Sequence, residues 1–279
     1  MTTLSPSTSA NTTYRTVAVE GVNIFYREAG PKDAPVLLLL HGFPSSSRMF
    51  DTLIPLLADR YHLVAPDYPG FGLSDAPPPE DFAYTFDHLA QVVNGFVEAL
   101  GLERYSLLLQ DYGGPIGFRL ALEHPERVQA LIIQNAVAHA EGLGPLWEAR
   151  KAYWRDRATY EAEVISAFTS LEGARQRHVG TSPQPERYNP DTWIDEFAAL
   201  SRPGQAKIQA DLFYDYHQCR LLPEVAGVAT RAQAAGAGGL GPLRPLLHRR
   251  RGRRLWPRCS RGGDPPSRRR ALRPRRKAG

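Results

Sequence analysis

The chain has 279 residues, of which 42% are hydrophobic and 23% are charged. This supply of apolar side chains suits one large domain with a core and excludes wholesale disorder. The longest apolar run, Pro35 to Leu40, is far shorter than the roughly 20 residues that a membrane span needs. With only Cys219 and Cys259, a disulfide framework and a Cys-rich zinc site are excluded. The Ser/Thr-rich residues 1–13 resemble a flexible N-terminus rather than a secretory signal, so a cytoplasmic location is expected.

The charge is distributed unevenly along the chain. Residues 217–279 hold 17 of the 34 Lys and Arg residues but only two of the 29 acidic residues. The same segment contains no Ile, Phe, Tyr or Met. Two such different compositions are unrelated, so residues 1–216 and 217–279 are interpreted separately.

Residues 14–136 show the alternation of strands and helices that is typical of an α/β fold with a mostly parallel sheet. Thr13–Gly21 and Val22–Gly30 predict two strands that form a hairpin. Beyond them, short apolar runs predict buried strands and amphipathic stretches predict helices. The expected strands are Pro35–Gly42, His62–Gly70, Ser106–Asp111 and Ala130–Ala136, and the expected helices are Arg48–Leu57, Phe86–Leu100 and one that ends near His124.

Residues 137–216 are rich in charged and aromatic side chains at helical spacing, which indicates a helical cap inserted into the fold. Most of these aromatic side chains are expected to pack between the cap helices. The candidates for contact with a substrate are Tyr153, Trp154, Tyr160 and Tyr188.

The segment Ser106–Gly117 reads SLLLQDYGGPIG, a buried strand that runs through a turn into a helix. A sharp turn of this kind lifts one side chain above the sheet edge and aims helix N–H groups at what that side chain attacks. Asp111 stands at the tip, where esterases with a Gly-x-Ser-x-Gly turn carry serine. The alternative is that Asp111 is a helix N-cap, a position that Asp favours.

A second motif, His41-Gly-Phe-Pro44, follows the expected strand Pro35–Gly42. A loop there would bring the backbone N–H of Phe43 beside that of Tyr112, and two converging donors form an oxyanion hole. His41 is interpreted as a structural loop residue rather than a base. A third motif, Asp67-Tyr-Pro-Gly-Phe-Gly-Leu-Ser-Asp75, follows the next strand.

With these motifs in this order, about Tyr14 to Tyr216 resembles the α/β-hydrolase fold family, in the branch with an aspartate nucleophile. That branch holds haloalkane dehalogenases and epoxide hydrolases. The resemblance implies that Asp111 attacks an sp3 carbon and forms an alkyl ester, which water hydrolyses with help from a histidine and an acid. It implies a small-molecule substrate, and because the sequence shows no metal, nucleotide or flavin motif, no cofactor or metal is expected. Hydrolysis of carboxylic esters is a less natural alternative, because the attack would give a reactive anhydride.

The resemblance leaves two substrate classes open. Haloalkane dehalogenases usually hold the halide with a Trp after the nucleophile and an Asn or Glu after His-Gly, where this chain has Tyr112 and Phe43. The His-Gly-Phe-Pro motif is more similar to that of epoxide hydrolases, whose cap tyrosines donate to the epoxide oxygen. This favours an epoxide slightly, with Tyr153, Tyr160 and Tyr188 as candidate donors.

The family pattern next requires a strand, an acid, a further strand and a histidine, and residues 217–279 show none of these. Arg, Pro, Ala and Gly dominate this tail, as they do when GC-rich DNA is read out of frame. Read one base later, the codons can encode Thr-Asn-Val-Ala-Ser-Tyr-Pro-Lys-Trp-Gln-Glu-Trp-Leu from His217, Val-Val-Trp-Gly-Arg-Tyr-Asp-Pro from Gly238 and Asp-Ala-Gly-His-Phe-Ala-Leu-Asp-Glu from Arg268.

Those three segments match the missing helix, the strand that ends in an acid, and the turn that carries the histidine. We therefore expect a frameshift near Tyr216–His217, with the acid written across the codons of Arg244 and Pro245 and the histidine across those of Ala271 and Leu272. The chain is then catalytically incomplete, and the last strands and the C-terminal helix are missing or disordered.

The alternative is a genuine basic tail that binds nucleic acid or another anion. Apart from Trp256, the tail has no aromatic side chain to stack on bases, and its mixed Gly and Pro prevent an amphipathic helix. Nucleic acid and membranes are therefore not expected partners. A non-catalytic binding protein with the hydrolase fold is the remaining alternative.

Overall fold

The computed structural model of the chain describes residues 11–137 and 147–218. By its internal contacts the chain divides into two units, Met1–Leu247 and His248–Gly279, and all described residues belong to the first. The expectations for residues 1–10 and for the tail beyond residue 218, including its absent strands and helix, lie outside the described residues.

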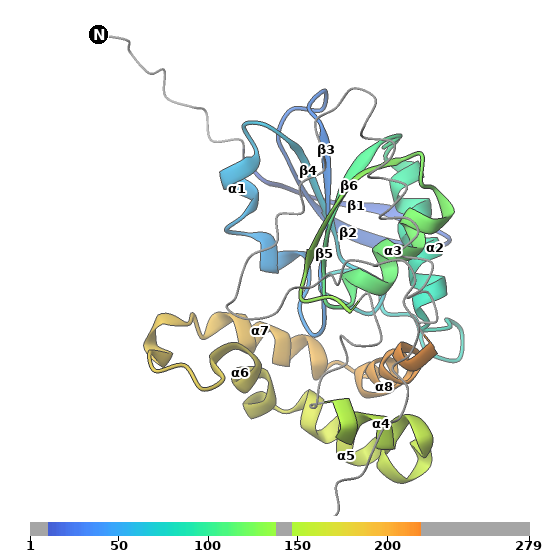
Figure 1. Cartoon of the computed structure of the whole chain (residues 1–279), viewed down its shortest axis with the longest axis vertical. Coiled ribbons are helices and arrows are strands. Elements are labelled where there is room, and N and C mark those ends of the chain that lie inside the picture. The colour runs from blue at the N-terminus through green and yellow to red at the C-terminus, as the bar shows by residue number, and fades with distance from the viewer. Residues whose placement is uncertain (1–10, 138–146, 219–279) are drawn as a thin grey trace, which may run out of the picture. The chain divides into compact units, whose positions relative to one another are not determined.

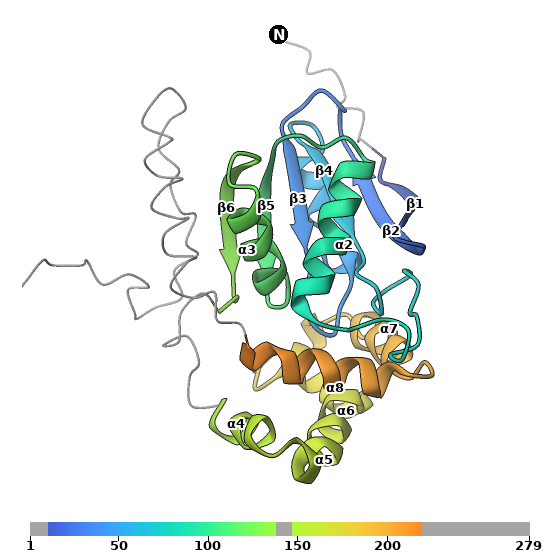
Figure 2. The same ribbon diagram turned by 90° about the vertical axis from the view of Figure 1, so that its right-hand side faces the viewer.

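A six-stranded sheet lies at the centre, with the strand order β1-β2-β4-β3-β5-β6 (Figures 1 and 2). The pairs β1–β2 and β2–β4 are antiparallel, whereas β3–β4, β3–β5 and β5–β6 are parallel. The hairpin and the mostly parallel sheet predicted from the sequence are thus confirmed. The strands are β1 Thr13–Val19, β2 Val22–Ala29, β3 Val36–Leu40, β4 His62–Pro66, β5 Tyr105–Gln110 and β6 Val128–Gln134.

The leucine run of β3 explains how the sheet is covered on both faces. Leu38 and Leu40 point into a core shared with α2 (Phe86–Ala99) and α3 (Gly113–Glu123). The alternate residues Leu37 and Leu39 point into a second, smaller core on the other face, below α1. Because successive side chains of a strand point to opposite faces, a continuous apolar run is what a strand between two helical layers requires.

The one helix expected over Arg48–Leu57 is instead two short pieces, and that prediction was wrong in detail. A 3₁₀-helix, η1, spans Ser47–Phe50, and α1 spans Ile54–Leu57. Pro55 stands in the first turn of α1. Proline has no N–H to donate to the preceding turn, so a helix can begin there but cannot run through it.

The helices that follow β6, which we refer to as the cap, lie on the side of the sheet at which β3 and β5 end (Figures 1 and 2). The last α-helix of the cap, α8, is anchored to the core by the hydrogen bond from the Phe86 N–H to Asp215 Oδ2, at 2.7 Å. The side-chain amide of Gln205 donates to the Gly70 carbonyl oxygen at 3.0 Å. The cap elements are α4 Trp147–Arg155, α5 Arg157–Thr169, α6 Leu171–Val179, η3 Pro185–Arg187, α7 Asp191–Leu200, α8 Gln205–Asp215 and η4 Tyr216–Gln218.

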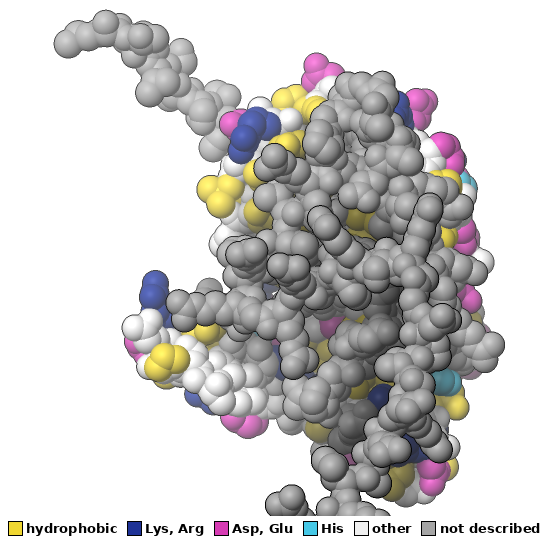
Figure 3. All heavy atoms as spheres, in the orientation of Figure 1, with side chains coloured by type: hydrophobic (Ala, Val, Ile, Leu, Met, Phe, Trp, Pro, Cys, Tyr) yellow, Lys and Arg dark blue, Asp and Glu magenta, His cyan; other side chains and the backbone are white. Residues whose placement is uncertain are grey.

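The acidic excess of the first 216 residues is visible on the surface. Figure 3 shows Asp and Glu side chains along the edge of the molecule on which α2 and α3 lie. Within the described residues, no helix has the length and apolar character needed to cross a membrane.

Candidate active site

Asp111 lies between the end of β5 and the start of α3, with a backbone φ of +49°. This left-handed conformation costs a residue with a Cβ atom about 1–2 kcal/mol, so the surroundings must hold it in place. Two glycines allow the close approach. A Cβ on Gly42 would lie 2.3 Å from the Asp111 Cβ, and one on Gly113 would lie 2.2 Å from the Leu40 carbonyl oxygen. The loop after β3, the tip and α3 therefore meet at Asp111.

Two backbone amides converge on the Asp111 carboxylate. The Phe43 N–H donates to Oδ1 at 2.8 Å, and the Tyr112 N–H also forms a hydrogen bond with the carboxylate. Tyr112, not Asp111, is the N-cap residue of α3, and no side chain caps that helix. The geometry is therefore that of a carboxylate held by two converging donors from two loops rather than that of a helix cap.

The carboxyl group of Asp111 is buried and poorly solvated. Burial raises the pKa of its carboxyl group above the ordinary value. The amides of Phe43 and Tyr112 and the positive charge of Arg150 oppose this rise but do not cancel it. An ionised carboxylate that has lost much of its hydration is more reactive toward an electrophile, because less water must be removed before it attacks.

His41 is a loop residue with both ring nitrogens engaged. Its Nδ1 contacts the Gly42 carbonyl oxygen at 3.2 Å, and its Nε2 lies 3.4 Å from the Tyr68 N–H. The ring stacks on Tyr68 with centroids 4.0 Å apart. Burial lowers the pKa of His41 to about 4, so the ring is neutral at pH 7. These contacts are those of a structural residue.

Asp67, the first residue of the third motif, has a comparable structural role. Its buried carboxylate accepts hydrogen bonds from the Ser47 N–H at 2.7 Å and from the Leu73 N–H at 2.8 Å. A Cβ on Gly72 would lie 1.9 Å from Asp67 Oδ2, so only glycine fits there. Asp67 thus ties together the loops that follow β3 and β4.

Aromatic side chains from the core and the cap surround the candidate site. The ring of Phe43 packs against Tyr112 at 5.7 Å and against Phe168 of α5 at 5.4 Å. Tyr112 in turn contacts the rings of Phe86 at 4.9 Å and Tyr216 at 5.8 Å. An apolar environment of this kind fits an uncharged organic chain next to the carboxylate.

The structure brings Asp111, Phe43 and Tyr112 together, but the side chains of two of the four cap candidates have other partners, and the other two are exposed. The Tyr153 hydroxyl is buried and donates to the Ala210 carbonyl oxygen at 2.9 Å. The Trp154 indole N–H donates to the Phe213 carbonyl oxygen at 2.9 Å. Tyr160 and Tyr188 are 38% and 39% exposed. The polar groups of Tyr153 and Trp154 are thus bonded to the backbone of α8, which helical spacing alone does not reveal. Contact of these four residues with substrate stays a prediction.

Two arginines near the site were not predicted from the sequence. The guanidinium of Arg177 lies 5.3 Å from the centre of the Phe43 ring, and its Nη2 donates to the Phe168 carbonyl oxygen at 3.0 Å. Arg150 lies 4.9 Å from the Trp147 ring and 5.8 Å from the Phe168 ring. Nothing in their local sequence separates them from the many other charged residues of the cap.

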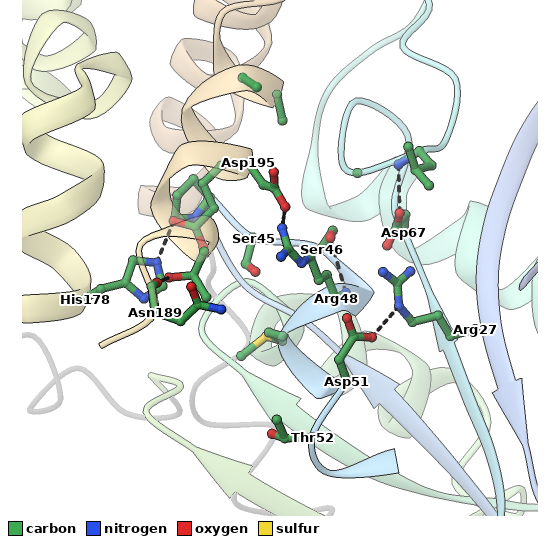
Figure 4. Close-up of a pocket in the computed structure, with 18 of the residues that line it drawn as sticks. Arg27, Ser45, Ser46, Arg48, Asp51, Thr52, Asp67, His178, Asn189 and Asp195 are labelled. Carbon is green, nitrogen blue, oxygen red and sulfur yellow. Dashed lines mark hydrogen bonds and ion pairs between the residues drawn. The ribbon is translucent and has the colours of Figure 1, made fainter. Parts of the chain in front are cut away.

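A cavity of about 850 Å³ lies between the loop after β3 and α7, and Asp111 is not among its lining residues (Figure 4). Most of its charged side chains are already paired within the cavity wall. The pairs are Arg27 with Asp51 at 2.7 Å, His178 with Glu196 at 2.8 Å, and Arg48 with Asp195. Two ion pairs and one His–Glu hydrogen bond are typical of a contact surface between core and cap rather than of a site that awaits a charged ligand.

Comparison with known proteins bears directly on this fold and site. The sequence profile of the alpha/beta hydrolase fold matches residues 35–220. The chain belongs to the α/β-hydrolase fold family. The fold class expected from the sequence is therefore confirmed, and the chain is a hydrolase by family.

Three proteins with similar sequences or structures show which members of the family the chain is similar to. An uncharacterized hydrolase of Saccharomyces cerevisiae is 41% identical over 210 residues, which cover 73% of this chain and 71% of that protein. A haloalkane dehalogenase of Bradyrhizobium diazoefficiens is 39% identical over 161 residues, or 58% of this chain and 47% of that protein. The crystal structure of a loop variant of a Bradyrhizobium elkanii haloalkane dehalogenase superposes with a TM-score of 0.60 at 25% identity, covering 82% of this chain and 78% of that one.

Proposed function

We propose that Asp111 is a carboxylate nucleophile that displaces a leaving group from an sp3 carbon. Oδ2 attacks the carbon, a C–O bond forms, and the bond to the halide or to the epoxide oxygen breaks with its electron pair. The product on the protein is an alkyl ester of Asp111. The observation that carries this proposal is the position of Asp111 at the tip of a strained turn, with Oδ1 held by the Phe43 amide.

The same amides suit the second half of the reaction. In the ester, Oδ1 becomes the carbonyl oxygen and still faces the Phe43 N–H, and we propose that the Tyr112 N–H, which bonds the same carboxyl group, joins it there. When water adds to the ester carbon, negative charge develops on this oxygen, and two preorganised donors stabilise it. A carboxylate nucleophile with an oxyanion hole thus supports alkylation followed by ester hydrolysis.

The substrate class we infer is an alkyl halide or an epoxide. The names of the dehalogenase relatives support a halide. The Phe43 side chain supports an epoxide, because it offers no hydrogen-bond donor to a departing halide at the position after His-Gly. Attack on a carboxylic ester would give an anhydride, so ester hydrolysis is less consistent with Asp111.

Covalent labelling tests the nucleophile. The full chain is incubated with 1-bromobutane or with styrene oxide, digested, and mapped by peptide mass spectrometry. One alkyl group on the peptide that contains Asp111 is expected, and none on that peptide in Asp111→Asn. Alkylation of Cys219 or Cys259 is scored separately. A folded chain that leaves Asp111 unmodified by both reagents would contradict the proposal.

We further propose that this chain cannot release the ester. Hydrolysis at neutral pH needs a base that activates water. Each histidine within residues 11–137 and 147–218 has a partner other than Asp111: His41 with Gly42 and Tyr68, His62 with Glu28, His88 with Ala83, His124 with Glu126, His178 with Glu196 and His217 with Tyr214. His139 and His248 lie outside the described residues, and in our proposal neither serves as the base, so the ester is expected to accumulate on the protein.

A frameshift near Tyr216–His217 accounts for the missing base in our proposal. The match to the family ends at residue 220, close to the point at which the composition changes. Resequencing the coding DNA across codons 205 to 279 tests this. A one- or two-base change that restores the encoded acid and histidine is the expected result. If the reading frame stands as given, the frameshift is wrong, and salt-dependent DNA binding by the basic tail becomes the next assay.

A further inference from the structure

The arginines Arg150 of α4 and Arg177 of α6 flank the candidate site from the cap side. Their contacts are with rings and a carbonyl oxygen: Arg150 with Trp147 and Phe168, and Arg177 with Phe43 and Phe168. Among the residues that the structure describes, no carboxylate forms an ion pair with either of them. Phe43 connects the two sides, since its amide holds Asp111 while its ring lies against the Arg177 guanidinium.

Two other arginines of the cap do have carboxylate partners, whereas Arg202, like Arg177, donates to backbone carbonyl oxygens. Arg157 pairs with Glu161 and with Asp211, the latter at 2.6 Å. Arg175, two residues before Arg177 on the same helix, pairs with Glu172 at 3.3 Å. Acidic partners are thus available on the cap surface, yet within the described residues neither Arg150, whose charge acts on Asp111, nor Arg177, which lies against the Phe43 ring, has one.

The charge of Arg150 acts both on Asp111 and on Arg177. The positive charge of Arg150 is one of the effects that oppose the rise in the pKa of Asp111. Desolvation and the charge of Arg150 both lower the pKa of Arg177, whereas Glu196 raises it. Glu196 itself is hydrogen-bonded to His178 at 2.8 Å. Arg150 and Arg177 are thus close enough for their charges to affect each other, and an anion between them would offset this repulsion, although the exposure of Arg177 lets water screen part of it.

We propose that Arg150 and Arg177 bind an anionic substituent, of the carboxylate class, on the molecule that alkylates Asp111. The guanidinium fork matches the two oxygens of a carboxylate. The rings of Phe43 and Phe168 then lie along the apolar part between the anion and the reacting carbon. This inference rests on the proposed function, and it narrows the substrate to a small acid that carries a halide or an epoxide.

A simpler role for Arg150 is to keep Asp111 ionised. That role predicts equal effects on charged and neutral reagents, because both need the same carboxylate. An anion site predicts a preference for the charged reagent that depends on both arginines. The ratio of the two alkylation rates therefore separates the two roles.

The experiment uses the full chain and two matched pairs of reagents, 3-bromopropanoate with 3-bromopropanamide and oxirane-2-carboxylate with oxirane-2-carboxamide. Rates of alkylation at Asp111 are measured by peptide mass spectrometry and corrected for the reactivity of each reagent toward free acetate. We expect the carboxylate of at least one pair to react about tenfold faster or more, since a charge-assisted pair contributes at least about 1.4 kcal/mol. Arg150→Gln and Arg177→Gln should each lower that ratio, and the double variant should bring it to about one.

Arg175→Gln is the matched control, because it removes an equal charge from the same helix and should leave the ratio unchanged. Equal rates for acid and amide in both pairs, with Asp111 labelled, would overturn the anion site and leave the nucleophile standing. If no reagent labels Asp111, the proposed function fails. Saturable binding of propanoate to the full chain, measured by calorimetry and lost in the double variant, would still support an anion site, and its absence would exclude one.

Discussion

At the scale of single residues, the strained backbone and the desolvated carboxylate of Asp111 lower the stability of the folded chain and raise the reactivity of that carboxylate. Because burial raises the pKa of Asp111 in the folded chain, the folded state binds this proton more tightly than the unfolded state. The stability that this group contributes is full below the unfolded pKa and is lost as pH rises through the raised folded pKa. At pH 7 the ionised carboxylate of Asp111 therefore destabilises the folded state.

Asp111→Asn should remove this destabilisation, because it replaces the charged carboxylate with a neutral amide. Asparagine keeps an oxygen that accepts from the Phe43 amide and tolerates the left-handed φ of +49°. We expect a higher melting temperature than for the unsubstituted chain at pH 7, and a difference that shrinks toward pH 4. Thermal unfolding followed by circular dichroism over this range checks it. A variant that is less stable at every pH would show that the carboxylate is not under electrostatic strain.

The sequence predicted that Asp111, Phe43 and Tyr112 lie close together, because each belongs to a short motif directly after a strand; their role as a site stays our proposal. It did not locate Arg150, Arg177 or the contacts of Phe168. Their placement depends on how the cap helices pack, and a helical stripe does not say which neighbour it faces. The same reason explains why Tyr153, expected as a candidate substrate contact, has its hydroxyl on the Ala210 carbonyl.

At the scale of elements, α3 must lie close to β3 for the amides to converge on Asp111. Gly113→Ala tests this, because the added methyl group would meet the backbone oxygen of Leu40 at 2.2 Å. The helix must shift, and we expect a loss of about 1–3 kcal/mol in the free energy of unfolding, measured in urea. The labelling rate at Asp111 should fall as well.

Gly95→Ala is the control for that substitution. Gly95 also lies in a helix, but its added methyl group would meet only a Val19 methyl at 2.7 Å, which can move. Alanine also gains about 1 kcal/mol of helix propensity over glycine. Gly95→Ala should therefore cost clearly less than Gly113→Ala. Equal losses would mean that the approach of α3 to β3 has no special role.

The ends of a strand or helix were predicted well where a single sequence pattern determined them. Strands β3 and β5 were predicted within about two residues, since an apolar run between polar turns has one interpretation. The helix over Arg48–Leu57 was predicted as one piece because its apolar spacing is helical throughout. The local backbone chemistry of Pro55 overrode that spacing.

At the scale of the whole molecule, β6 is the last strand that the structure describes, and within the described residues it pairs only with β5. Its sequence VQALIIQ is apolar and mostly half-buried. An unpaired apolar edge favours association with other chains. We expect the 279-residue chain to self-associate with rising concentration in analytical ultracentrifugation, and a chain with the restored frame to do so less. Equal association of both would contradict a missing sheet edge.

The central claim is that Asp111 forms an ester which this chain does not release. The most direct test is to measure how many equivalents of product form per protein chain over time with excess reagent. For an alkyl halide the released halide is measured, and for an epoxide the ring-opened group bound to the protein is measured. We predict one equivalent per folded chain, retained as a single adduct on Asp111 in the intact mass, and no adduct at that residue in Asp111→Asn. Steady release of many equivalents of product, with Asp111 unmodified, would contradict the account.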